Sequence, residues 1–321
     1  MKFGLIGHPI ARSLSPGLFK SAYDGKYPYD LIQGEDFEES YQRFLDGYDG
    51  INVTAPFKEL AFAKADIISE ECRLAKATNL LVKTPEGVKA YNSDLLGVRL
   101  WLQEITSVAS SDAVPLASAD PASGAAASKR TPPTSWAPPP AARGVARFSP
   151  AAASDAEPKR ITVLICGCGG AGKAAAVAAA TLGMKCILMN RDIARAEELA
   201  ENLNSNIGKD YSDRTIAEVQ PLSGFCGCFR EADIIIYNIP SAIPEINMLK
   251  DTDFNCGTPK HILEANYKDP SFDEEFQKKM RNANPQATYT GGKIWLLYQA
   301  LTGYEIFTGE KPDLERMSAL L

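Results

Sequence analysis

The chain has 321 residues and carries 34 Lys and Arg against 40 Asp and Glu, a net charge of −6 that argues against a nucleic-acid binder. Its 45% hydrophobic and 23% charged residues are typical of a folded globular protein, and at roughly 150 residues per domain the length suits two domains. No apolar stretch approaches the roughly 18 residues that a membrane span needs, and the N-terminus turns after one short strand, so we expect a cytoplasmic protein.

Residues that commonly hold metal ions are scarce. His8 and His261 are the only histidines, and none of the seven cysteines forms a C-x-x-C pair. We therefore expect neither a metal site nor a disulfide framework. Proton chemistry, if present, should depend on Lys, Asp, Glu or Tyr.

The first block, residues 1–106, alternates strand and helix patterns. Ser15-Pro16 resembles a helix start with a serine N-cap and a proline at the first helical position. Asp94 is expected to open another helix, which carries Leu95, Val98, Trp101 and Leu102. Strands are expected at 3–6, 50–53, 80–83 and 88–91, the last two as a hairpin, with a further helix at 37–45.

A compositional break covers residues 107–158. Ala, Pro and Ser dominate there, with proline clusters at 132–133 and 138–140. Such a segment buries too little apolar surface to offset its loss of conformational entropy. We predict a disordered insertion between two folded blocks.

The second block, residues 159–292, again alternates strands and helices. Strands are expected at 161–165, 185–189, 232–237 and 261–265, and helices at 174–182 and 193–203. This order is typical of a Rossmann-type, doubly wound parallel sheet. A final helix at 293–307 has no strand after it, so the segment 293–321 is expected to complete the first block. The fold class is therefore α/β, with an N-terminal α/β domain followed by a Rossmann-type domain.

A glycine-rich motif lies between the first strand and the first helix of the second block. It reads Gly167-Cys168-Gly169-Gly170-Ala171-Gly172 and matches G-x-G-x-x-G. Glycines at these positions permit a tight turn and let the backbone approach a pyrophosphate at the helix N-terminus. The motif predicts dinucleotide binding.

The residues after the second strand of this block should select the cofactor. They are Asn190, Arg191 and Asp192, with Arg195 a helical turn later. An arginine accommodates the 2′-phosphate of NADP, whereas an acid hydrogen-bonds the free 2′-hydroxyl of NAD. Both are present here, and we favour NADP while leaving NAD open.

Polar residues gather where strands of the first block end. A polyhydroxylated small molecule with a carboxylate would suit this mixture of hydroxyls, amides, an amine and a carboxylate. Each residue also has a structural alternative, such as capping for Ser15 and Asp94 or a turn role for Thr54. The clusters are Ser13-Leu14-Ser15-Pro16, Asn52 to Lys58, Asn79, and Asn92-Ser93-Asp94.

Together these motifs resemble the shikimate dehydrogenase family over both blocks, apart from the insertion. Matching segments follow one another in the family's order. They are Gly7 to Pro16 (G-x-P-x-x-x-S-x-S-P), Asn52 to Lys58 (N-V-T-x-P-x-K), Ala77-Thr78-Asn79, Asn92 to Gly97 (N-T-D-x-x-G with Ser at its second position), Gly167 to Ala171, Asn190-Arg191 and Gln299-Ala300.

The resemblance implies roles for the matched residues. Lys58 and Asp94 would be catalytic, with the lysine as proton donor and acceptor. The groups implied to hold the substrate are Ser13, Ser15, Thr54, Asn79, Tyr267 and Gln299. The groups implied to hold the cofactor are Gly167, Gly169, Gly170, Ala171, Gly172, Asn190, Arg191, Asp192 and Gly292. The family usually has Thr where Asp192 stands, and its turn near the nicotinamide is replaced here by residues 237–242.

The expected activity is the reversible, NADPH-dependent reduction of 3-dehydroshikimate to shikimate in the biosynthesis of chorismate and the aromatic amino acids. An NAD-dependent quinate/shikimate dehydrogenase is one alternative. A regulatory protein that binds a dinucleotide or shikimate without turnover is another, although a pure binder has no need of the proton donor Lys58. We expect a monomer or homodimer acting on a small molecule, without nucleic-acid or membrane partners.

Overall fold

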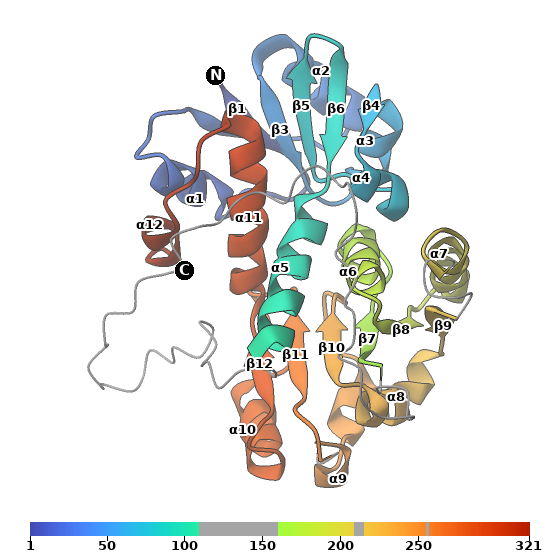
Figure 1. The fold of residues 1–321 in the computed structure, drawn as a ribbon. Coiled ribbons are helices and arrows are strands. Elements are labelled where there is room, and N and C mark those ends of the chain that lie inside the picture. Colours follow the sequence, from blue (N-terminus) through green and yellow to red (C-terminus); the bar gives the residue numbers. More distant parts are fainter. Residues whose placement is uncertain (109–159, 209–214, 255–256) are drawn as a thin grey trace.

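The computed structural model describes residues 1–108, 160–208, 215–254 and 257–321. Figure 1 shows two lobes, each built around a sheet, with two long helices running side by side along them. Within the described residues the strands form two six-stranded sheets, one from residues 3–91 and one from residues 162–290.

The first sheet is mixed, and helices cover both of its faces. Its strands are β1 (Phe3–Gly7), β2 (Tyr29–Gln33), β3 (Gly50–Val53), β4 (Ile67–Ile68), β5 (Leu80–Thr84) and β6 (Gly87–Tyr91), in the order β2-β1-β3-β5-β6-β4. The pairs β1–β2, β1–β3 and β4–β6 are parallel, whereas β3–β5 and β5–β6 are antiparallel. The helices of this region are α1 (Ser15–Ala22), α2 (Phe37–Gly47), α3 (Lys58–Lys64), α4 (Glu70–Ala75) and α5 (Ser93–Val108).

The second sheet is parallel throughout and doubly wound, which confirms the predicted fold class. Its strands are β7 (Thr162–Cys166), β8 (Lys185–Met189), β9 (Ala217–Val219), β10 (Ile234–Tyr237), β11 (His261–Glu264) and β12 (Thr288–Thr290), in the order β12-β11-β10-β7-β8-β9. Its helices are α6 (Gly170–Thr181), α7 (Ile193–Asn206), α8 (Phe225–Glu231), α9 (Asp251–Phe254) and α10 (Glu274–Ala283). This order has the Rossmann arrangement, with its switch point between β7 and β10.

The C-terminal helices α11 (Gly292–Thr308) and α12 (Leu314–Ser318) return to the first sheet. Phe307 of α11 stacks on Phe3 of β1, with ring centroids 4.8 Å apart. Phe19 of α1 and Met317 of α12 belong to the same buried cluster. One face of the first sheet is therefore covered by α1, α11 and α12.

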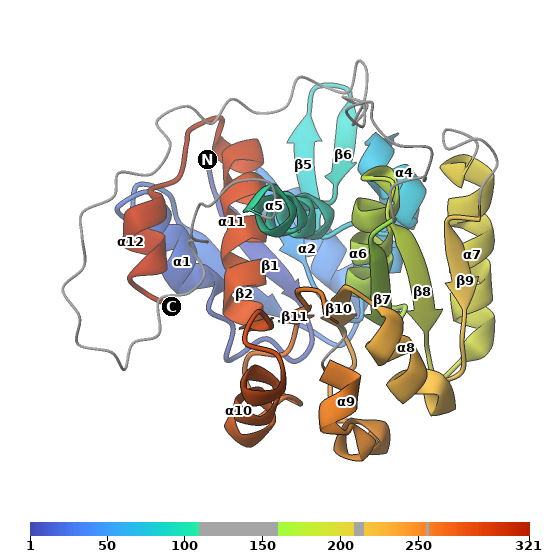
Figure 2. The same cartoon turned by 60° about the horizontal axis from the view of Figure 1, so that its bottom comes forward.

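Helix α5 connects the cores of the two lobes. Leu95, Val98 and Trp101 of α5 lie in one buried cluster with Val163 of β7 and the alanines of α6. Trp101 Nε1 donates a hydrogen bond to Thr290 Oγ1 of β12 at 3.3 Å. Figure 2, seen from another side, again places α5 between α11 and α6. The distance between the lobes is thus set by packed helices.

Glycine permits the close crossing of α5 and α11. A Cβ atom on Gly97 of α5 would lie 2.7 Å from the backbone nitrogen of Gln299 in α11. A Cβ atom on Gly303 of α11 would lie 2.9 Å from Ser93 Oγ at the start of α5. Larger residues at these two positions would push the helices apart.

Some sequence expectations were wrong in detail. Ser15 is the first helical residue of α1, not its N-cap, and its backbone N–H donates to Ser13 Oγ at 3.2 Å. The predicted insertion begins too early, because α5 continues through Ser107 and Val108, and its remainder, 109–158, lies outside the described residues. Several elements were not predicted. The short ones, among them β4, α3, β9 and β12, have too few residues to show a periodicity, but the five-residue strand β2 and the ten-residue helix α10 were missed as well.

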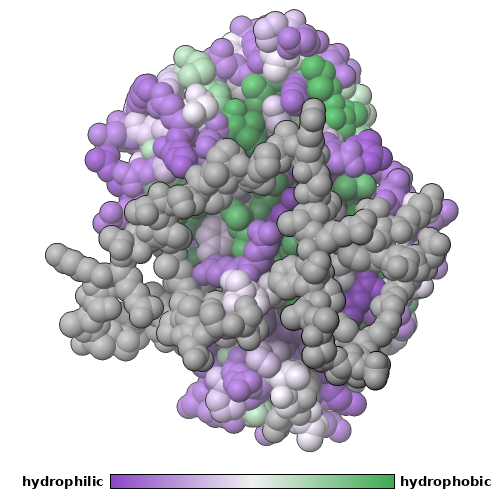
Figure 3. Space-filling view, in the orientation of Figure 1, coloured by the Kyte–Doolittle hydropathy of each residue, from purple (hydrophilic) through white to green (hydrophobic). Residues whose placement is uncertain are grey.

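Hydrophilic residues are prominent around the rim of the face seen in Figure 3. Among the residues that the structure describes, no helix is long and apolar enough to cross a membrane. The same residues contain no cluster of three or more His, Cys, Asp or Glu side chains that could hold a metal ion.

We predict that Gly97→Ala destabilises the protein, although alanine is the better helix former. The added methyl group meets backbone, which cannot rotate away, and overpacking of this kind costs about 1–3 kcal/mol. Gly227→Ala is a matched control, because Gly227 lies in the middle of the short helix α8 with nothing within 4 Å of its Cβ position. Urea denaturation should show a lower free energy of unfolding for Gly97→Ala and no decrease for Gly227→Ala. Equal stability of both variants would contradict the close crossing.

Candidate functional site

A polar cavity lies where the carboxyl ends of strands from both sheets meet. Leu5 of β1 and Val53 of β3 line it from the first sheet, and Tyr267, just after β11, lines it from the second. Its volume is about 210 Å³, below the roughly 300–1,000 Å³ of sites for drug-sized ligands. The cavity therefore suits a small polar molecule.

The structure brings together every residue that was predicted to be catalytic or to bind substrate. These residues all line the cavity: Ser13, Ser15, Thr54, Lys58, Asn79, Asp94, Tyr267 and Gln299. Four more polar residues line the cavity. Asn52 and Ser93 belong to the predicted polar clusters but had no role of their own, and Lys268 and Tyr304 were not predicted. Asn52 and Ser93 stand inside the matched motifs, and Tyr304 shares a helix face with Ala300, four residues earlier, so helical spacing was an available signal.

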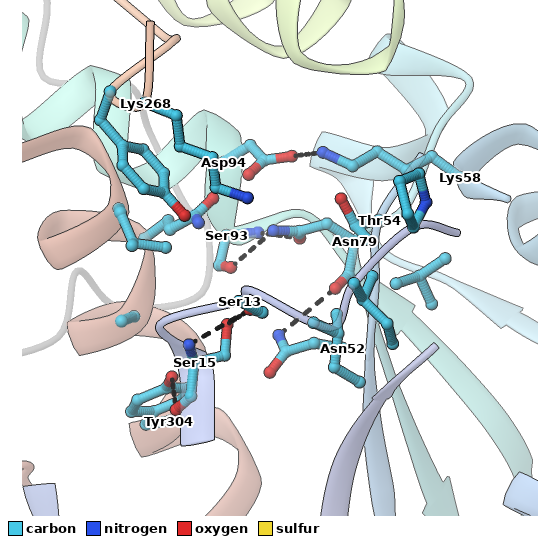
Figure 4. Close-up of a pocket in the computed structure, with 18 residues that line it drawn as sticks. Ser13, Ser15, Asn52, Thr54, Lys58, Asn79, Ser93, Asp94, Lys268 and Tyr304 are labelled. Carbon is cyan, nitrogen blue, oxygen red and sulfur yellow. Dashed lines mark hydrogen bonds and ion pairs between the residues drawn. The ribbon is translucent and has the colours of Figure 1, made fainter. Parts of the chain in front are cut away.

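Lys58 and Asp94 form an ion pair through Lys58 Nζ and Asp94 Oδ2, shown in Figure 4. The two side chains are only 15% and 6% exposed. Lys58 is the first residue of α3 and Asp94 is the second residue of α5. A buried ammonium held by a carboxylate at the wall of a small cavity is a suitable proton donor for a bound ligand.

Asn92 and Asn79 hold the start of α5, and with it Asp94. Asn92 Oδ1 accepts a hydrogen bond from Leu95 N at 3.0 Å, so Asn92 caps the helix and Asp94 does not. Asn92 Nδ2 donates to Ala77 O at 3.0 Å. Asn79 Oδ1 accepts from Ser93 N at 2.8 Å, and its Nδ2 donates to Ser93 Oγ at 2.9 Å. The Asp94 carboxylate is left to face Lys58, in a helical turn whose macrodipole favours an anion.

Lys58 is held by contacts from both lobes. Its carbonyl oxygen accepts a hydrogen bond from Thr78 N at 3.1 Å. From the second lobe, Gly170 lies so close that a Cβ atom there would be 2.8 Å from Lys58 Cδ. The lysine that faces the cavity thus also touches the glycine motif.

Hydroxyl groups gather at the other end of the cavity. Ser13 Oγ and Ser15 Oγ are 3.1 Å apart, and Tyr304 donates to Ser15 O at 3.2 Å, as Figure 4 shows. Burial raises the pKa of Tyr304 above its ordinary value, and burial also raises the pKa of Tyr267. These phenols stay protonated at neutral pH, so the charged side chains that line the cavity are Lys58, Asp94 and Lys268.

Buried Glu264 holds the loop that carries Tyr267 and Lys268. At the end of β11, Glu264 Oε1 accepts from Ser271 N at 2.5 Å, and its Oε2 accepts from the Tyr289 hydroxyl at 2.8 Å. Burial and the Glu264 charge raise the pKa of Tyr289, so its hydroxyl remains a donor. In Figure 4, Lys268 lies on the opposite side of Asp94 from Lys58 and adds a second cation to the cavity wall.

The glycine motif has the geometry that a dinucleotide pyrophosphate requires. Gly167 has φ +95°, and a Cβ on Gly172 would lie 1.8 Å from the Gly167 carbonyl oxygen, so both positions need glycine. Nothing lies within 4 Å of the Cβ position of Gly169, where the helix α6 begins. Gly170 and Ala171 form its first turn, with backbone N–H groups free for an anion.

Asn238 provides a second indication of a ligand at this place. It follows β10 directly, as Gly167 follows β7, so both stand at the switch point of the sheet. Both polar side-chain atoms of Asn238 are buried and have no hydrogen-bond partner. Buried amides are rarely left without partners, and a polar cofactor bound here would supply them.

The residues after β8 lie beside this loop. Asn190 Oδ1 accepts from Cys168 N at 3.1 Å, and its Nδ2 donates to Asp192 O at 2.8 Å, so its amide ties the two loops together. Arg191 and Asp192 are exposed. Arg195 Nε lies 3.5 Å from Asp192 Oδ2, whereas Arg191 has no ion-pair partner within the part of the chain that the structure describes.

Gly292 has a structural reason to be glycine. A Cβ atom there would lie 2.1 Å from the carbonyl oxygen of Ala265, just after β11. The start of α11 is therefore pressed against the end of that strand. This packing is sufficient to require glycine, and a cofactor role for Gly292 stays a prediction.

Part of the first lobe is similar to a known protein family. Residues 5–81 match the family model described as the shikimate dehydrogenase substrate binding domain. A curated relative named shikimate dehydrogenase (NADP(+)) from Acinetobacter baumannii is 26% identical over 323 residues, covering 98% of both chains. Another of the same name, from Methanothermobacter thermautotrophicus, is also 26% identical, covering 99% of this chain and 94% of the relative.

Solved structures share the complete two-lobed fold. Quinate dehydrogenase from Corynebacterium glutamicum in complex with NAD has a TM-score of 0.70 at 20% identity, covering 100% of this chain and 98% of that one. Shikimate 5-dehydrogenase from Thermus thermophilus in complex with NADP(H) and shikimate has a TM-score of 0.67 at 20% identity, with the same coverage. The chain thus shares its fold with these solved structures, its residues 5–81 match the substrate binding domain model, and along nearly its whole length it is similar to curated proteins named shikimate dehydrogenase (NADP(+)).

Proposed function

We propose that this chain is a shikimate dehydrogenase, which interconverts 3-dehydroshikimate and shikimate with NADP in the biosynthesis of chorismate and the aromatic amino acids. The observation that carries the proposal is the buried Lys58–Asp94 ion pair, which lines a small polar cavity and touches the glycine motif. Curated relatives named shikimate dehydrogenase (NADP(+)) support it.

The cavity has the functional groups that such a substrate needs. Shikimate carries a carboxylate and three hydroxyls, and 3-dehydroshikimate has a ketone in place of one hydroxyl. Hydroxyl and amide donors can bind the carboxylate and orient the hydroxyls. We assign this role to Ser13, Ser15, Thr54, Asn79, Tyr267 and Gln299, all of which line the cavity. The cations Lys58 and Lys268 add an electrostatic preference for an anionic ligand.

Lys58 handles the proton of the reaction. When bound, a nicotinamide cofactor supplies a hydride to the substrate ketone, or accepts one from the alcohol. As the ketone oxygen becomes negative, Lys58 Nζ donates a proton to it, and in the reverse direction the neutral amine takes the proton back. Asp94 holds the ammonium in place and accepts a hydrogen bond from the substrate hydroxyl.

Binding of the dinucleotide is assigned to the second lobe. Gly167, Gly169, Gly170, Ala171 and Gly172 form the turn and the helix start that would hold the pyrophosphate. The free N–H groups of α6 and the open space at Gly169 support this assignment.

The choice of NADP is assigned to Arg191. Its guanidinium is exposed after β8, where the adenosine ribose lies in Rossmann domains. Asp192 would favour NAD, but its carboxylate is 3.5 Å from Arg195 Nε, which reduces the repulsion of a 2′-phosphate. The residues 191, 192 and 195 together carry one net positive charge.

An NAD-dependent quinate/shikimate dehydrogenase is the second candidate. Asp192 at the ribose position favours it, because an acid can accept a hydrogen bond from the free 2′-hydroxyl. Quinate dehydrogenase from Corynebacterium glutamicum, whose structure was solved with NAD, has the same fold.

The deciding experiment measures nicotinamide absorbance with purified protein and four pairs of reactants, shikimate or quinate with NADP or NAD. Reduction of NADP by shikimate with the highest kcat/KM of the four supports the proposal. A higher value for quinate with NAD favours the second candidate. Binding of both ligands without turnover in any pair would mean that the chain acts as a binding protein.

We predict that Lys58→Met and Lys58→Ala lower kcat by about 10²–10⁴-fold, because they remove the general acid and base. Substrate affinity should change little, since the other polar groups of the cavity remain. Lys64→Met on the same helix is the matched control, because Lys64 is exposed and pairs with Glu38 on the surface. Steady-state kinetics and calorimetric titration with shikimate give the two quantities. A Lys58 variant with a near-normal rate would remove the lysine from the mechanism.

We also predict that Arg191→Ala raises KM for NADP by about 10–100-fold, the loss of a charged hydrogen bond worth about 1.5–3 kcal/mol. KM for NAD should stay within a factor of a few, since NAD has no 2′-phosphate. Arg43→Ala on α2, also an exposed arginine, is the control for a change in net charge. If Arg191→Ala raised KM for NADP and KM for NAD by the same factor, the guanidinium would not be the group that binds the 2′-phosphate.

A further inference from the structure

An ion pair joins the two lobes beside Lys58. Lys173 Nζ of α6 lies 2.7 Å from Glu59 Oε1 of α3. Glu59 follows Lys58 directly in the sequence, and Lys173 follows Gly172, the last glycine of the G-x-G-x-x-G motif. The pair therefore links the helix that begins with Lys58 to the helix that begins at the glycine motif.

The helix α3 has little apolar anchoring of its own. It has seven residues, of which only Ala61 is buried, and Leu60 is 50% exposed. Its apolar contacts with the core are made by Ala61 and the half-buried Phe62, both beyond its first two residues. Polar contacts at its first turn therefore contribute to the orientation of the end that carries Lys58.

The position of Lys173 is unfavourable for a positive charge without a nearby anion. It lies in the first turn of the 12-residue helix α6, whose macrodipole disfavours positive charge. Its side chain is 13% exposed, so the loss of Glu59 would leave a mostly buried charge unpaired. The pair is thus more strongly coupled than an ordinary surface ion pair, although Glu59 itself is 53% exposed.

The same surfaces touch at a second point. A Cβ atom on Gly170 would lie 2.8 Å from Lys58 Cδ, so the Lys58 chain passes directly over the first turn of α6. A movement of α3 away from α6 would move Lys58 Nζ away from the place where the cofactor loop and the cavity meet.

We propose that Glu59 and Lys173 are positioning residues, whose ion pair holds α3 against the glycine motif and so keeps Lys58 in place for proton transfer. This inference rests on the proposed function for its catalytic consequence. The ion pair would thus hold Lys58 at a fixed distance from the glycine motif, although the two belong to different lobes.

Another ion pair between the lobes provides a matched control. Lys76, at the end of α4, lies 3.2 Å from Glu198 of α7, and their side chains are 50% and 60% exposed. This pair joins the same two lobes but touches neither Lys58 nor the glycine motif. A general weakening of the contact between lobes would affect both pairs alike.

The test compares Glu59→Gln, Lys173→Met, the charge exchange Glu59→Lys with Lys173→Glu, and Glu198→Gln. For each full-length variant we would measure kcat, KM for shikimate and the Kd of NADPH. Hydrogen exchange of the peptide covering residues 58–64, with and without NADPH, reports on α3 independently of activity.

We expect each single variant of the pair to lower kcat by about 10–100-fold, as a displaced catalytic group does. KM for shikimate should change less than about threefold, exchange in residues 58–64 should rise, and the charge exchange should restore part of kcat. Glu198→Gln should resemble the unmodified protein in all of these measurements.

Other outcomes overturn the inference. Unchanged kcat in Glu59→Gln would show that the pair does not position Lys58. A rise in the Kd of NADPH for Lys173→Met alone, with Glu59→Gln normal, would make Lys173 a cofactor ligand. If the unmodified protein had no activity, the proposed function would fail, and the exchange data alone would decide whether the pair holds α3.

Discussion

The burial of two opposite charges, Lys58 and Asp94, is the constraint on which the rest of the site depends. Taking each ion out of water costs several kcal/mol, so both must be held in good geometry by the surrounding structure. Asp94 meets this condition in the first turn of α5, where the helix macrodipole favours a carboxylate. Asn92 caps that turn and ties it to the loop at Ala77. Some polar residues of the motifs, such as Asn92, therefore hold the ion pair in place, whereas others line the cavity.

The position of Lys58 relative to the glycine motif follows from helix packing. Helices α5 and α11 cross closely because Gly97 leaves room for the backbone of Gln299. On its other side α5 packs against the alanines of α6, whose small side chains permit a short distance between the helix axes. These helix contacts place the cavity at the carboxyl ends of the first sheet next to the switch point of the second sheet. Packed helices therefore fix the position of one lobe relative to the other. The segment 109–159, which connects the lobes in the sequence, lies outside the described residues.

The residues that line the cavity could be predicted from the sequence better than the local structure around them. Motif order pointed to Lys58 and Asp94, which the structure brings together, and their roles stay a proposal. Ser15 shows the limit, because Ser-Pro fits a helix cap, yet the cap position belongs to Leu14 and the Ser15 hydroxyl lines the cavity. Lys268 was missed since it reaches the cavity only through the loop that Glu264 holds, a contact without local sequence signal. The pair Glu59–Lys173 joins residues 114 positions apart, so only the folded chain reveals it.

Charges interact less strongly around Arg191 and Asp192 than in the cavity that contains Lys58 and Asp94. Lys58 and Asp94 interact in a poorly solvated cavity, where one charge strongly constrains the other. Arg191 and Asp192 lie in solvent, and the 3.5 Å contact of Asp192 with Arg195 joins side chains that are about 60% exposed. An exposed ion pair such as Asp192–Arg195 is worth at most about 1 kcal/mol and weakens with salt. Recognition of a 2′-phosphate by Arg191 should likewise weaken as ionic strength rises, whereas the proton transfer that we propose for Lys58, shielded from solvent, should depend little on salt.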